Sequence, residues 1–582
     1  MTKKQTIKYY IWLAVGVIIF WLITLTPINI FDEGFFLQLI ILSVLILVPQ
    51  ILRVRRDKSR GGATADEPLE EEGRVFEERQ QGPFKVYRRK HAQPQFKNYF
   101  GEFKDLLKRL RLLWIPVGLL VLYIILQLTS APLFRAKSYA ALIDKQQGDF
   151  KADISEIAID EIPLIDRDTS IRLGNKKMGE LPELVSQFEV APDYTQINFQ
   201  NRPVRVTPLK YDDLIKWFTN RSEGLPRIVR IDMNTGEVTL QKLPSGMKYS
   251  ESEPLFRNIR RHLRLRYPLD ILDRSVLEID EEGIPYWITP VVKPQVGWFK
   301  GRDVKQVIIC NALTGETEKF DIGEIPEWID RVYPSEMIIK QLDDNGKFQS
   351  GWFNSVLGQK GVLQTTSGYN YLALNDDVYL YTGITPVTED SSNLGFVLVN
   401  LRTKDTRFYP VASADEYSAM RSAEGAVQEK GYISTFPLLL NIKGRPTYCM
   451  ALKDSAQLVK MYALVDAQDY QTTATGPSLR TAVQNYEIAL TVKSPVTEGE
   501  EIPADQLTDE TVTIDAVQNV VLEGNTFYYM QFKEHPDRVF TASLQTADFL
   551  PFLKQGDKIV IHYVPTEFAE SLQQIERIER AK

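Results

Sequence analysis

Three stretches without a charged residue lie near the start of this 582-residue chain and determine where the rest of it can fold. They are Tyr9–Phe31, Phe35–Leu52 and Leu112–Phe134. A helix rises about 1.5 Å per residue, so roughly 20 apolar residues cross the ~30 Å hydrocarbon core of a bilayer. An exposed helix of a soluble domain keeps a polar face, which these stretches lack. The sequence therefore predicts three transmembrane helices.

Charged residues beside the first two stretches predict the orientation of the chain. Lysines precede the first stretch, basic residues from Arg53 to Arg60 follow the second, and the connection carries only Asp32 and Glu33. By the positive-inside rule, residues 1–53 form a transmembrane hairpin with both basic ends in the cytoplasm. The alternative of a cleaved signal peptide fits less well, because the first apolar run is too long and a second follows. We expect a multi-pass protein of a bacterial cell membrane, with a cytoplasmic N-terminus and a large extracytoplasmic C-terminal region.

The segment between the hairpin and the third span divides into two parts. Residues 54–95 are polar, which predicts a disordered cytoplasmic linker. Residues 96–134 combine a basic amphipathic pattern with the third apolar stretch. That pattern predicts a helix at the inner headgroup layer that leads into the third transmembrane helix. The alternative is an amphipathic helix packed on a partner protein.

Composition limits the class of protein. The chain is too long for one hydrophobic core, so several domains are expected. Its net charge is −7, and its basic clusters flank the apolar stretches, so we expect no nucleic-acid partner. Two cysteines, Cys310 and Cys449, cannot form a disulfide framework and are expected to be buried as small hydrophobic residues. A large exported region with so few cysteines is typical of a bacterial envelope, that of a Gram-positive cell in our interpretation.

One short pattern recurs four times in the exported region: an apolar strand, a polar turn, a second strand and a third strand that ends in a turn. The strands of the first two copies lie at 197–208 with 227–237, and at 277–290 with 307–316. The third copy comprises Tyr371–Leu374, Val378–Pro386 and Phe396–Thr403, with Arg402-Thr403-Lys404 in the place of Thr-Gly-Glu. The fourth copy comprises Pro437–Asn441, Pro446–Leu452 and Lys460–Asp466.

Alternating apolar and polar residues in each copy favour a small antiparallel sheet. Helical patterns precede two copies, at Phe256–Arg266 and at Ala414–Glu429. Each unit is therefore predicted to be an α+β module with one face of its sheet covered by a helix. The expected domains are the first module at 135–270, the second at 271–365, and the third and fourth at 366–480.

The strand that ends in Asp/Asn-x-x-Thr-Gly-Glu, at Asp232–Glu237 and Asn311–Glu316, resembles the PepSY module of bacterial envelope proteins. The chain as a whole resembles an uncharacterised family of Gram-positive membrane proteins with PepSY-like extracytoplasmic repeats. This resemblance implies a binding or inhibitory role toward peptidases or cell-wall enzymes, and it implies no catalytic residues.

Residues 481–582 show a different pattern, with short strands separated by Gly-Asn and Gly-Asp turns. Five strands in a short chain segment predict a closed or nearly closed β-barrel, which we expect to be OB-like. The predicted strands are Tyr486–Val492, Thr511–Leu522, Thr526–Phe532, Val539–Leu544 and Lys558–Val564.

The sequence offers no catalytic, cofactor-binding or metal-binding residues that we would assign. The sequence lacks nucleotide-binding and hydrolase motifs, and its four histidines, His91, His262, His535 and His562, are isolated. Three acidic groups could serve a hydrolase if they converged in a cleft, but the last two of them fall in predicted turns, which Asp stabilises. The groups are Asp160-Glu161, Asp280–Glu282 and Asp376-Asp377.

Two further patterns are interpreted as packing. Arginines between positions 257 and 266 predict a solvated helix face, with Phe256, Ile259, Leu263 and Leu265 packed inward; an anionic partner is the alternative. The Gly-Trp-Phe triplets at 297–299 and 351–353 are expected to fill the layer between adjacent modules, with a ligand groove as the alternative.

These observations predict a three-helix membrane anchor, an α+β region of PepSY-like repeats and a C-terminal barrel. The function expected for such a chain is that of a non-enzymatic scaffold or adaptor that binds or regulates another envelope protein. Its partners would be the lipid bilayer and an envelope protein or a second copy of itself, with no cofactor. The alternative is a hydrolase of wall polymer or peptides with acids from separate modules, and a transporter is a more distant one.

Overall fold

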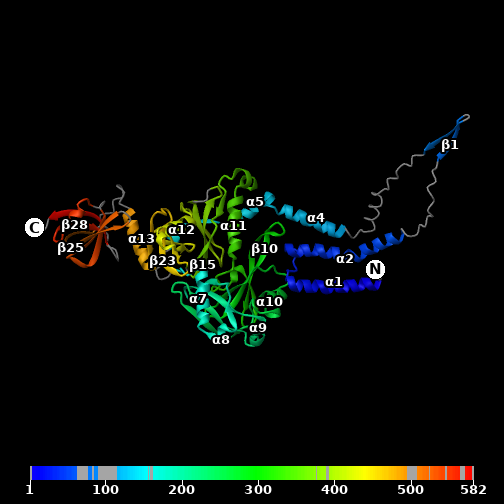
Figure 1. Cartoon of the computed structure of the whole chain (residues 1–582), viewed down its shortest axis with the longest axis horizontal. Helices are drawn as coiled ribbons and strands as arrows, with labels where there is room; N and C mark the ends of the chain where they lie inside the picture. The colour runs from blue at the N-terminus through cyan, green and yellow to red at the C-terminus, as the bar shows by residue number, and fades with distance from the viewer. Residues whose placement is uncertain are drawn as a thin grey trace.

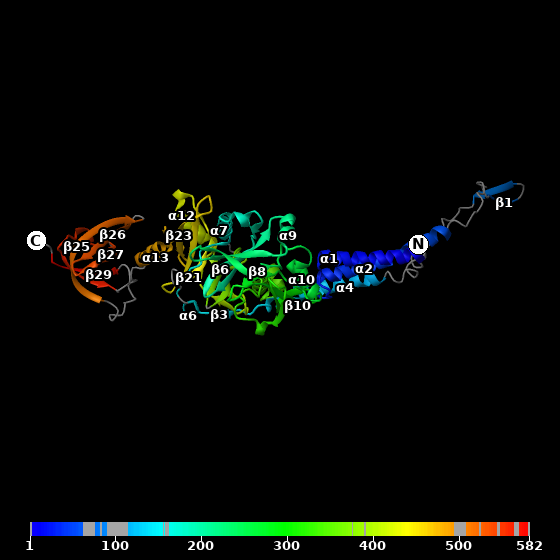
Figure 2. The same ribbon diagram turned by 90° about the horizontal axis from the view of Figure 1, so that it is seen from below.

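The structure of the chain is a computed structural model. The molecule is elongated. Apolar helices lie at one end, a region of small sheets lies in the middle and a β-barrel lies at the other end (Figures 1 and 2). The structure describes residues 3–61, 76–81, 84–89, 114–154, 156, 162–374, 376–388, 392–493, 508–522, 525–543, 547–563 and 570–579.

Two helices at the N-terminus are long and apolar enough to cross a membrane, α1 (Lys3–Thr24) and the Glu33–Gln50 part of α2 (Glu33–Gly61). They are antiparallel neighbours at the same end of the molecule (Figure 1). The third apolar stretch forms α4 (Trp114–Thr129) and α5 (Pro132–Ala140), which are bent by 53° relative to each other. At about 1.5 Å per residue, the described residues of α4 alone cover less than the ~30 Å core of a bilayer. The pair makes a third span only if both parts are counted as one.

The segment predicted to be a disordered linker contains regular structure. Helix α2 continues to Gly61, and β1 (Phe76–Gln81) pairs antiparallel with β2 (Phe84–Arg89). In the backbone register of this hairpin, residue 77 pairs with residue 88. The predicted amphipathic helix from residue 96 lies outside the described residues up to position 113.

Four sheets form the middle region, and their main strands follow one another along the chain. All strand pairs are antiparallel except one in the third sheet. The first contains β4 (Phe188–Val190), β5 (Thr195–Phe199), β6 (Arg202–Tyr211), β7 (Leu225–Asp232) and β8 (Val238–Met247). The second contains β9 (Val276–Ile279), β10 (Pro285–Val296), β11 (Lys300–Asn311) and β12 (Thr317–Asp321). The third contains β13 (Leu363–Thr365), β14 (Asn370–Leu374), β15 (Asp377–Pro386), β17 (Gly395–Asn400), β18 (Thr406–Tyr409) and β3 (Gln146–Gln147). The fourth contains β20 (Ile433–Ser434), β21 (Leu438–Ile442), β22 (Arg445–Lys453), β23 (Val459–Asp466) and β24 (Thr473–Gly476).

The sheets share one strand order. Each sheet has one long central strand, which is β6, β10, β15 and β22 in turn. In the first two sheets this strand pairs on one side with the strand that precedes it in the chain and on the other side with the strand that follows it. The same relationship holds in the third and fourth sheets. The next strand, β8, β12, β18 or β24, then extends each sheet by one more antiparallel pairing.

The turn after the third strand of each copy is built in the same way. A side-chain oxygen of Asp232, Asn311, Asn400 or Asp466 accepts hydrogen bonds from the backbone N–H groups two and three residues later, at 2.8–3.1 Å. Such turns are the reason that Asp and Asn are favoured at these positions. In the third copy Thr403, Lys404 and Asp405 take the places of Thr-Gly-Glu, one residue later than predicted, and Lys404 has a φ of 69°.

A helix precedes each sheet and covers it. Asp166, Asn258 and Asp415 cap three of these helices at their N-termini. The four helices are α7 (Arg167–Gly179), α10 (Ile259–Arg266), α11 (Ser335–Phe348) and α12 (Glu416–Gly425). Shorter elements are α6 (Phe150–Asp153), α8 (Pro182–Val185), α9 (Leu214–Asn220), the bridge-like β16 (Ser392–Asn393) with β19 (Ser413–Ala414), and the single turns η3 (Leu255–Arg257), η4 (Ile322–Glu324), η5 (Asn354–Gly358), η6 (Gln428–Lys430) and η7 (Leu550–Phe552).

Neighbouring sheets share hydrophobic cores. Buried Ile228 of the first sheet packs in one core with Trp287 of the second, and Val307 of the second packs in another core with Val397 of the third. A further core joins the third and fourth sheets. Because each core draws on two sheets, the middle region is continuous and its modules do not fold around separate interiors.

The module boundaries differ from those predicted. Strands β3 and β13, expected in the first and second modules, both belong to the third sheet. Phe150 likewise packs into the core shared by the third and fourth sheets. Short segments such as these carry too little pattern of their own to reveal a partner that lies far along the chain.

The C-terminal region is a closed barrel with the strand order β25-β26-β27-β29-β28. Its strands are β25 (Thr508–Leu522), β26 (Asn525–Phe532), β27 (His535–Ser543), β28 (Lys558–Tyr563) and β29 (Glu570–Glu579). The predicted strand Tyr486–Val492 is wrong: it lies within the helix α13 (Leu479–Lys493), whose Ala482, Val483 and Tyr486 are buried in the core of the fourth sheet at helical spacing. Strand β29 was not predicted.

Candidate functional site: the membrane-proximal junction

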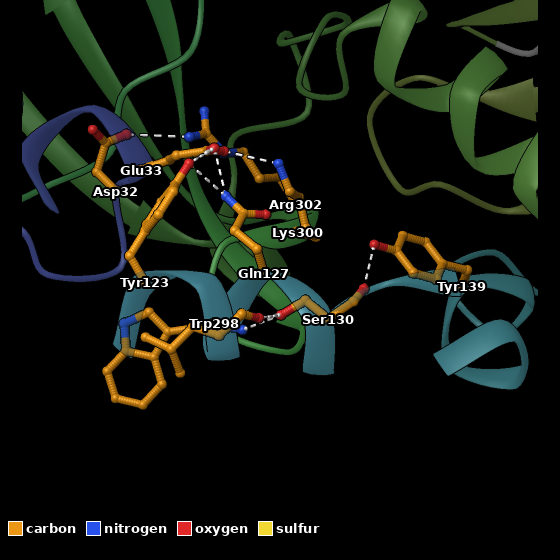
Figure 3. Close-up of polar contacts among 10 residues, drawn as sticks. Asp32, Glu33, Tyr123, Gln127, Ser130, Tyr139, Trp298, Lys300 and Arg302 are labelled. Atoms are coloured by element: carbon orange, nitrogen blue, oxygen red, sulfur yellow. Dashed lines mark hydrogen bonds and ion pairs between the residues drawn. The ribbon is translucent and has the colours of Figure 1, made fainter. Parts of the chain in front are cut away.

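The loop between α1 and α2 is fixed to the middle region at a place that we call the junction. It comprises the α1–α2 loop, the C-terminal end of α4, helix α10 and the tip of the β10–β11 hairpin. Figure 3 shows that the carboxylate of Glu33 lies at its centre. Glu33 accepts hydrogen bonds from Tyr123 and Gln127 of α4 and from Lys300 of β11, the last at 2.8 Å. One carboxylate therefore joins two apolar helices to the second sheet.

The neighbouring carboxylate, that of Asp32, makes a second connection. Its Oδ1 accepts a hydrogen bond from the N–H of Phe35 in the first turn of α2, while its Oδ2 lies 3.1 Å from the guanidinium of Arg302. The Asp32 side chain is mostly buried, and a negative charge at the N-terminus of a helix is favourable. Asp32 thus begins α2 and also binds the second sheet.

Helix α10 contacts the other side of the same loop. The buried side chain of Arg264 donates from Nε to the carbonyl oxygen of Leu25 at 2.8 Å. Its Nη1 donates to the carbonyl oxygens of Tyr267 and Asp270. Burial lowers the pKa of this arginine to about 10, although the nearby carboxylate of Asp32 favours the charged form.

Backbone contacts complete this side of the junction. The N–H of Ile28 donates to the carbonyl of Pro268 at 2.7 Å, and the side-chain amide of Asn29 donates to the carbonyl of Leu269 at 2.8 Å. The loop is therefore held at successive residues, which restricts rotation of the middle region about it.

The tip of the β10–β11 hairpin inserts aromatic side chains between the apolar helices. The indole N–H of Trp298 donates to the carbonyl of Ile30, and its ring lies 4.7 Å from that of Phe31. Phe299 is 2% exposed and packs on Phe36 of α2 and Tyr123 of α4. The prediction that this triplet fills the layer between adjacent modules is wrong, because its aromatic side chains contact the α1–α2 loop and the apolar helices.

Gly297 sets the path of this tip. Its φ is +63°, and a Cβ at this position would lie 1.9 Å from the hydroxyl oxygen of Ser130. That hydroxyl accepts a hydrogen bond from the N–H of Trp298, and Tyr139 donates to the Ser130 carbonyl (Figure 3). The second triplet differs: Trp352 packs near Tyr139, whereas Phe353 is 66% exposed.

A cluster of buried charged groups lies between the first three sheets. Glu278 of β9 is fully buried and accepts hydrogen bonds from the N–H groups of Asp330 and Arg331. Burial raises the pKa of Glu278 to about 7. Burial and the nearby Glu278 raise the pKa of Asp330 well above its usual value. Asp330 in turn accepts a hydrogen bond from the N–H of Asn198, so the cluster connects the sheets.

The acidic residues considered for a hydrolase serve other purposes in the structure. Oδ1 of Asp280 accepts hydrogen bonds from the N–H groups of Glu282 and Ile284 and closes the β9–β10 turn. Asp376 occupies the β14–β15 turn with a φ of 67°. Asp377 forms an ion pair with Arg402. The pair at 160–161 lies outside the described residues.

The arginine-rich helix differs in part from its prediction. Ile259 and Leu263 are buried as expected, but Arg264 is buried as well, and Phe256 and Leu265 are exposed. The last turn of this short helix faces the α1–α2 loop. Arg264 therefore lies inward, where the carbonyl oxygen of Leu25 accepts a hydrogen bond from it.

The remaining candidate residues make local contacts. Cys310 and Cys449 are buried, as predicted, and burial raises the pKa of each thiol to about 12. His535 pairs with Glu510, and His562 with Asp509, while His262 contacts the carbonyl of Gly315. His91 is not among the described residues. No group of three or more metal-ligating side chains converges within the part of the chain that the structure describes.

Comparisons with known proteins add little to this geometry. No protein family model matches the chain, and no curated protein matches it. One solved structure, described as a protein of unknown function from Dyadobacter fermentans DSM 18053, is 9% identical and covers 66% of this chain and 93% of its own, with a TM-score of 0.16. That score supports no inference about fold or function.

Sequence reasoning missed the junction. Asp32 and Glu33 were interpreted only as the acidic turn of a hairpin, and their partners lie about 270 residues later. A signal was present: Lys300 and Arg302 closely follow the aromatic pair of the first Gly-Trp-Phe triplet, a composition that suits the surface of a membrane.

Proposed function

We propose that the protein is a membrane-anchored scaffold or adaptor of a bacterial envelope that binds or regulates another envelope protein. Helices α1 and α2, with the α4–α5 pair as a third span, would hold it in the membrane. The basic residues that flank α1 and the inner part of α2 support a cytoplasmic N-terminus and an extracytoplasmic middle region and barrel.

The junction is the observation that carries this proposal. A catalytic domain tethered to a membrane needs no fixed orientation, and a flexible linker would suffice for it. Here Asp32, Glu33 and Leu25 are each bound by side chains of the second sheet or of α10. The middle region is therefore held in one orientation relative to the apolar helices, as a platform that positions a partner requires.

The arrangement beyond the junction supports the same role. Shared cores join the four sheets, and the barrel lies at the end of the molecule farthest from the apolar helices (Figure 1). The common strand order and the common Asp/Asn turn support classification of the modules as PepSY-like. Strand order β25-β26-β27-β29-β28, with β27 and β29 parallel, supports classification of the barrel as OB-like.

The class of partner follows from the PepSY resemblance, which implies a peptidase or a cell-wall enzyme. A second copy of the chain is the other candidate. The hydrolase alternative gains no support from Asp280, because the β9–β10 turn uses that carboxylate.

The test is the mass of the full chain in mild detergent after cross-linking in intact membranes. We expect a stoichiometric complex heavier than the 66.8 kDa chain, recovered again when the partner carries the affinity tag. A uniform monomer, with no protein captured reciprocally, would contradict a scaffold role. Release of products from purified cell wall or peptides by the same preparation would favour the hydrolase instead.

A further inference from the structure

An exposed apolar surface lies beside the junction on the first and second modules. Its six members are large hydrophobic side chains, each 59–73% exposed: Leu214, Ile215, Phe218, Leu255, Phe256 and Leu269. We call it the apolar rim. Single exposed hydrophobic residues are ordinary on a protein surface, but a group of this kind on adjacent short elements marks an interaction site.

Hydrogen bonds within and around α9 hold three side chains of the rim in their exposed positions. In α9, Asp213 caps the helix by accepting hydrogen bonds from the N–H groups of Ile215 and Lys216. Trp217 points inward and donates to the buried carboxylate of Glu253, which also binds Tyr211. With Trp217 fixed in this way, Leu214, Ile215 and Phe218 are turned toward the outside.

A chain of contacts connects α9 to the outer end of α1. Arg257 of η3 donates to the carbonyl of Arg221, the residue after α9. Helix α10 follows η3 directly, and its Arg264 binds Leu25, the residue after α1. Leu269 lies in the next segment and accepts a hydrogen bond from Asn29 of the α1–α2 loop. Figures 1 and 2 both place α9 and α10 in the part of the middle region that borders α1.

The elements of the rim therefore lie close to the level at which α1 leaves the membrane. An apolar surface at that level meets the boundary between headgroups and acyl chains, where apolar side chains enter the bilayer and arginines remain among the headgroups. Arg221 fits this arrangement, since its guanidinium lies 4.3 Å from the centre of the Phe218 ring.

We propose that the apolar rim inserts into the outer leaflet of the membrane that α1 and α2 span, so that lipid is its partner. This inference rests on the proposed membrane anchoring but not on the scaffold role. Insertion would make the middle region lie on the membrane surface at the rim as well as at the junction, which fixes its tilt.

The test is quenching of a polarity-sensitive fluorophore by nitroxide-labelled lipids in vesicles that contain the full chain. Single cysteines replace Phe218 and Phe256, and a matched control replaces Leu458, a 48% exposed residue of the fourth module. The native thiols are buried with pKa values of about 12, so they react slowly in the folded protein. A label at Ile18 of α1, which is 59% exposed, reports on the membrane anchor itself.

We expect the labels at 218 and 256 to emit at shorter wavelength and to lose emission to the quencher lipids, while the label at 458 does neither. Full emission at 218 and 256 together with quenching at 18 would overturn the proposal and leave the anchor intact. Labels at 218 and 256 shielded from aqueous iodide but not quenched by lipid would overturn it in favour of a protein partner. Absence of quenching at 18 would overturn both the anchor and the rim.

Discussion

The guanidinium of Arg264 binds the carbonyl oxygen of Leu25 across 239 positions of sequence. Leu25 directly follows α1 and has a φ of 53°, a left-handed conformation that often ends a helix. A cation at the carboxyl end of a helix also interacts favourably with the helix dipole. Arg264 therefore ends α1 and fastens it to the middle region.

Replacement of Arg264 by methionine should weaken the junction. The aliphatic volume is kept, but the carbonyls of Leu25, Tyr267 and Asp270 lose their donor, at a cost of about 1–3 kcal/mol of unfolding free energy. Thermal unfolding in detergent, together with proteolysis of the α1–α2 loop, measures the effect. Arg260→Met on the exposed face of the same helix is the matched control and should leave both readouts unchanged. Equal behaviour of the two variants would contradict the role assigned to Arg264.

Trp298→Ala should loosen the hairpin tip from the apolar helices. It removes a hydrogen bond to Ile30 and the ring contact with Phe31, which together contribute about 1–3 kcal/mol. Hydrogen exchange measures this effect, and we expect the backbone amides of residues 28–32 to exchange faster in this variant. Phe353→Ala, in the exposed second triplet, should have little effect, and a comparable change there would argue against a special role for the first triplet.

Glu278 should make stability depend on pH. Its folded-state pKa of about 7 exceeds the ordinary value of 4.5, so between these values only the folded state holds the proton. The unfolding free energy should therefore fall as pH rises through this window, by about 1.4 kcal/mol per unit at most, and Asp330 acts in the same direction. Unfolding midpoints measured from pH 4.5 to 7 should show a weaker dependence in Glu278→Gln.

The control for that experiment is Glu282→Gln, an exposed residue of the following turn. It should keep the pH dependence of the parent protein. A Glu278→Gln variant with an unaltered slope would show that another group carries the effect.

The turns at Asp232 and Asp466 have the same backbone hydrogen bonds but differ in how deeply the carboxylate is buried. Asp232 and Asp466 accept equivalent backbone hydrogen bonds, but the Asp466 side chain is fully buried and also binds Arg445 and Tyr486. Asp232→Ala should cost about 1 kcal/mol, as loss of a side-chain cap does. Asp466→Ala should cost a further amount of about 1.5–3 kcal/mol, because it removes charge-assisted hydrogen bonds to Arg445, whose side chain is 38% exposed, and to buried Tyr486. Chemical denaturation of both variants measures the difference, and similar losses would refute this explanation.

Much of the local structure followed from the sequence. Uncharged runs as long as Tyr9–Phe31 can be solvated only by lipid or by a large interior, so α1 and α2 were predicted with their hairpin connection. Three strands of each of the four sheets were predicted near their observed positions, because alternation of apolar and polar residues is a local property. The strands that extend the sheets, β8, β12, β18 and β24, were not predicted. The burial of Cys310 and Cys449 followed from the apolar, strand-like segments in which they lie.

Other elements depended on partners that the sequence does not reveal. Residues 486–492 are apolar enough for a strand, but they lie in α13, whose Tyr486 packs into the core of the fourth sheet. Strand β29 has few apolar residues, and its pairing with β27 and β28 closes the barrel.

Sequence by itself determined which segments are apolar, where three strands of each sheet in the middle region lie and where Asp or Asn turns the chain, since each depends on neighbours a few positions away. Tertiary structure alone decided that Asp32 binds Arg302, that Glu33 binds Lys300 and that Arg264 lies buried beneath the α1–α2 loop. The sequence does not identify the partner of a charged side chain, because the energy of an ion pair depends on distance in space and on burial.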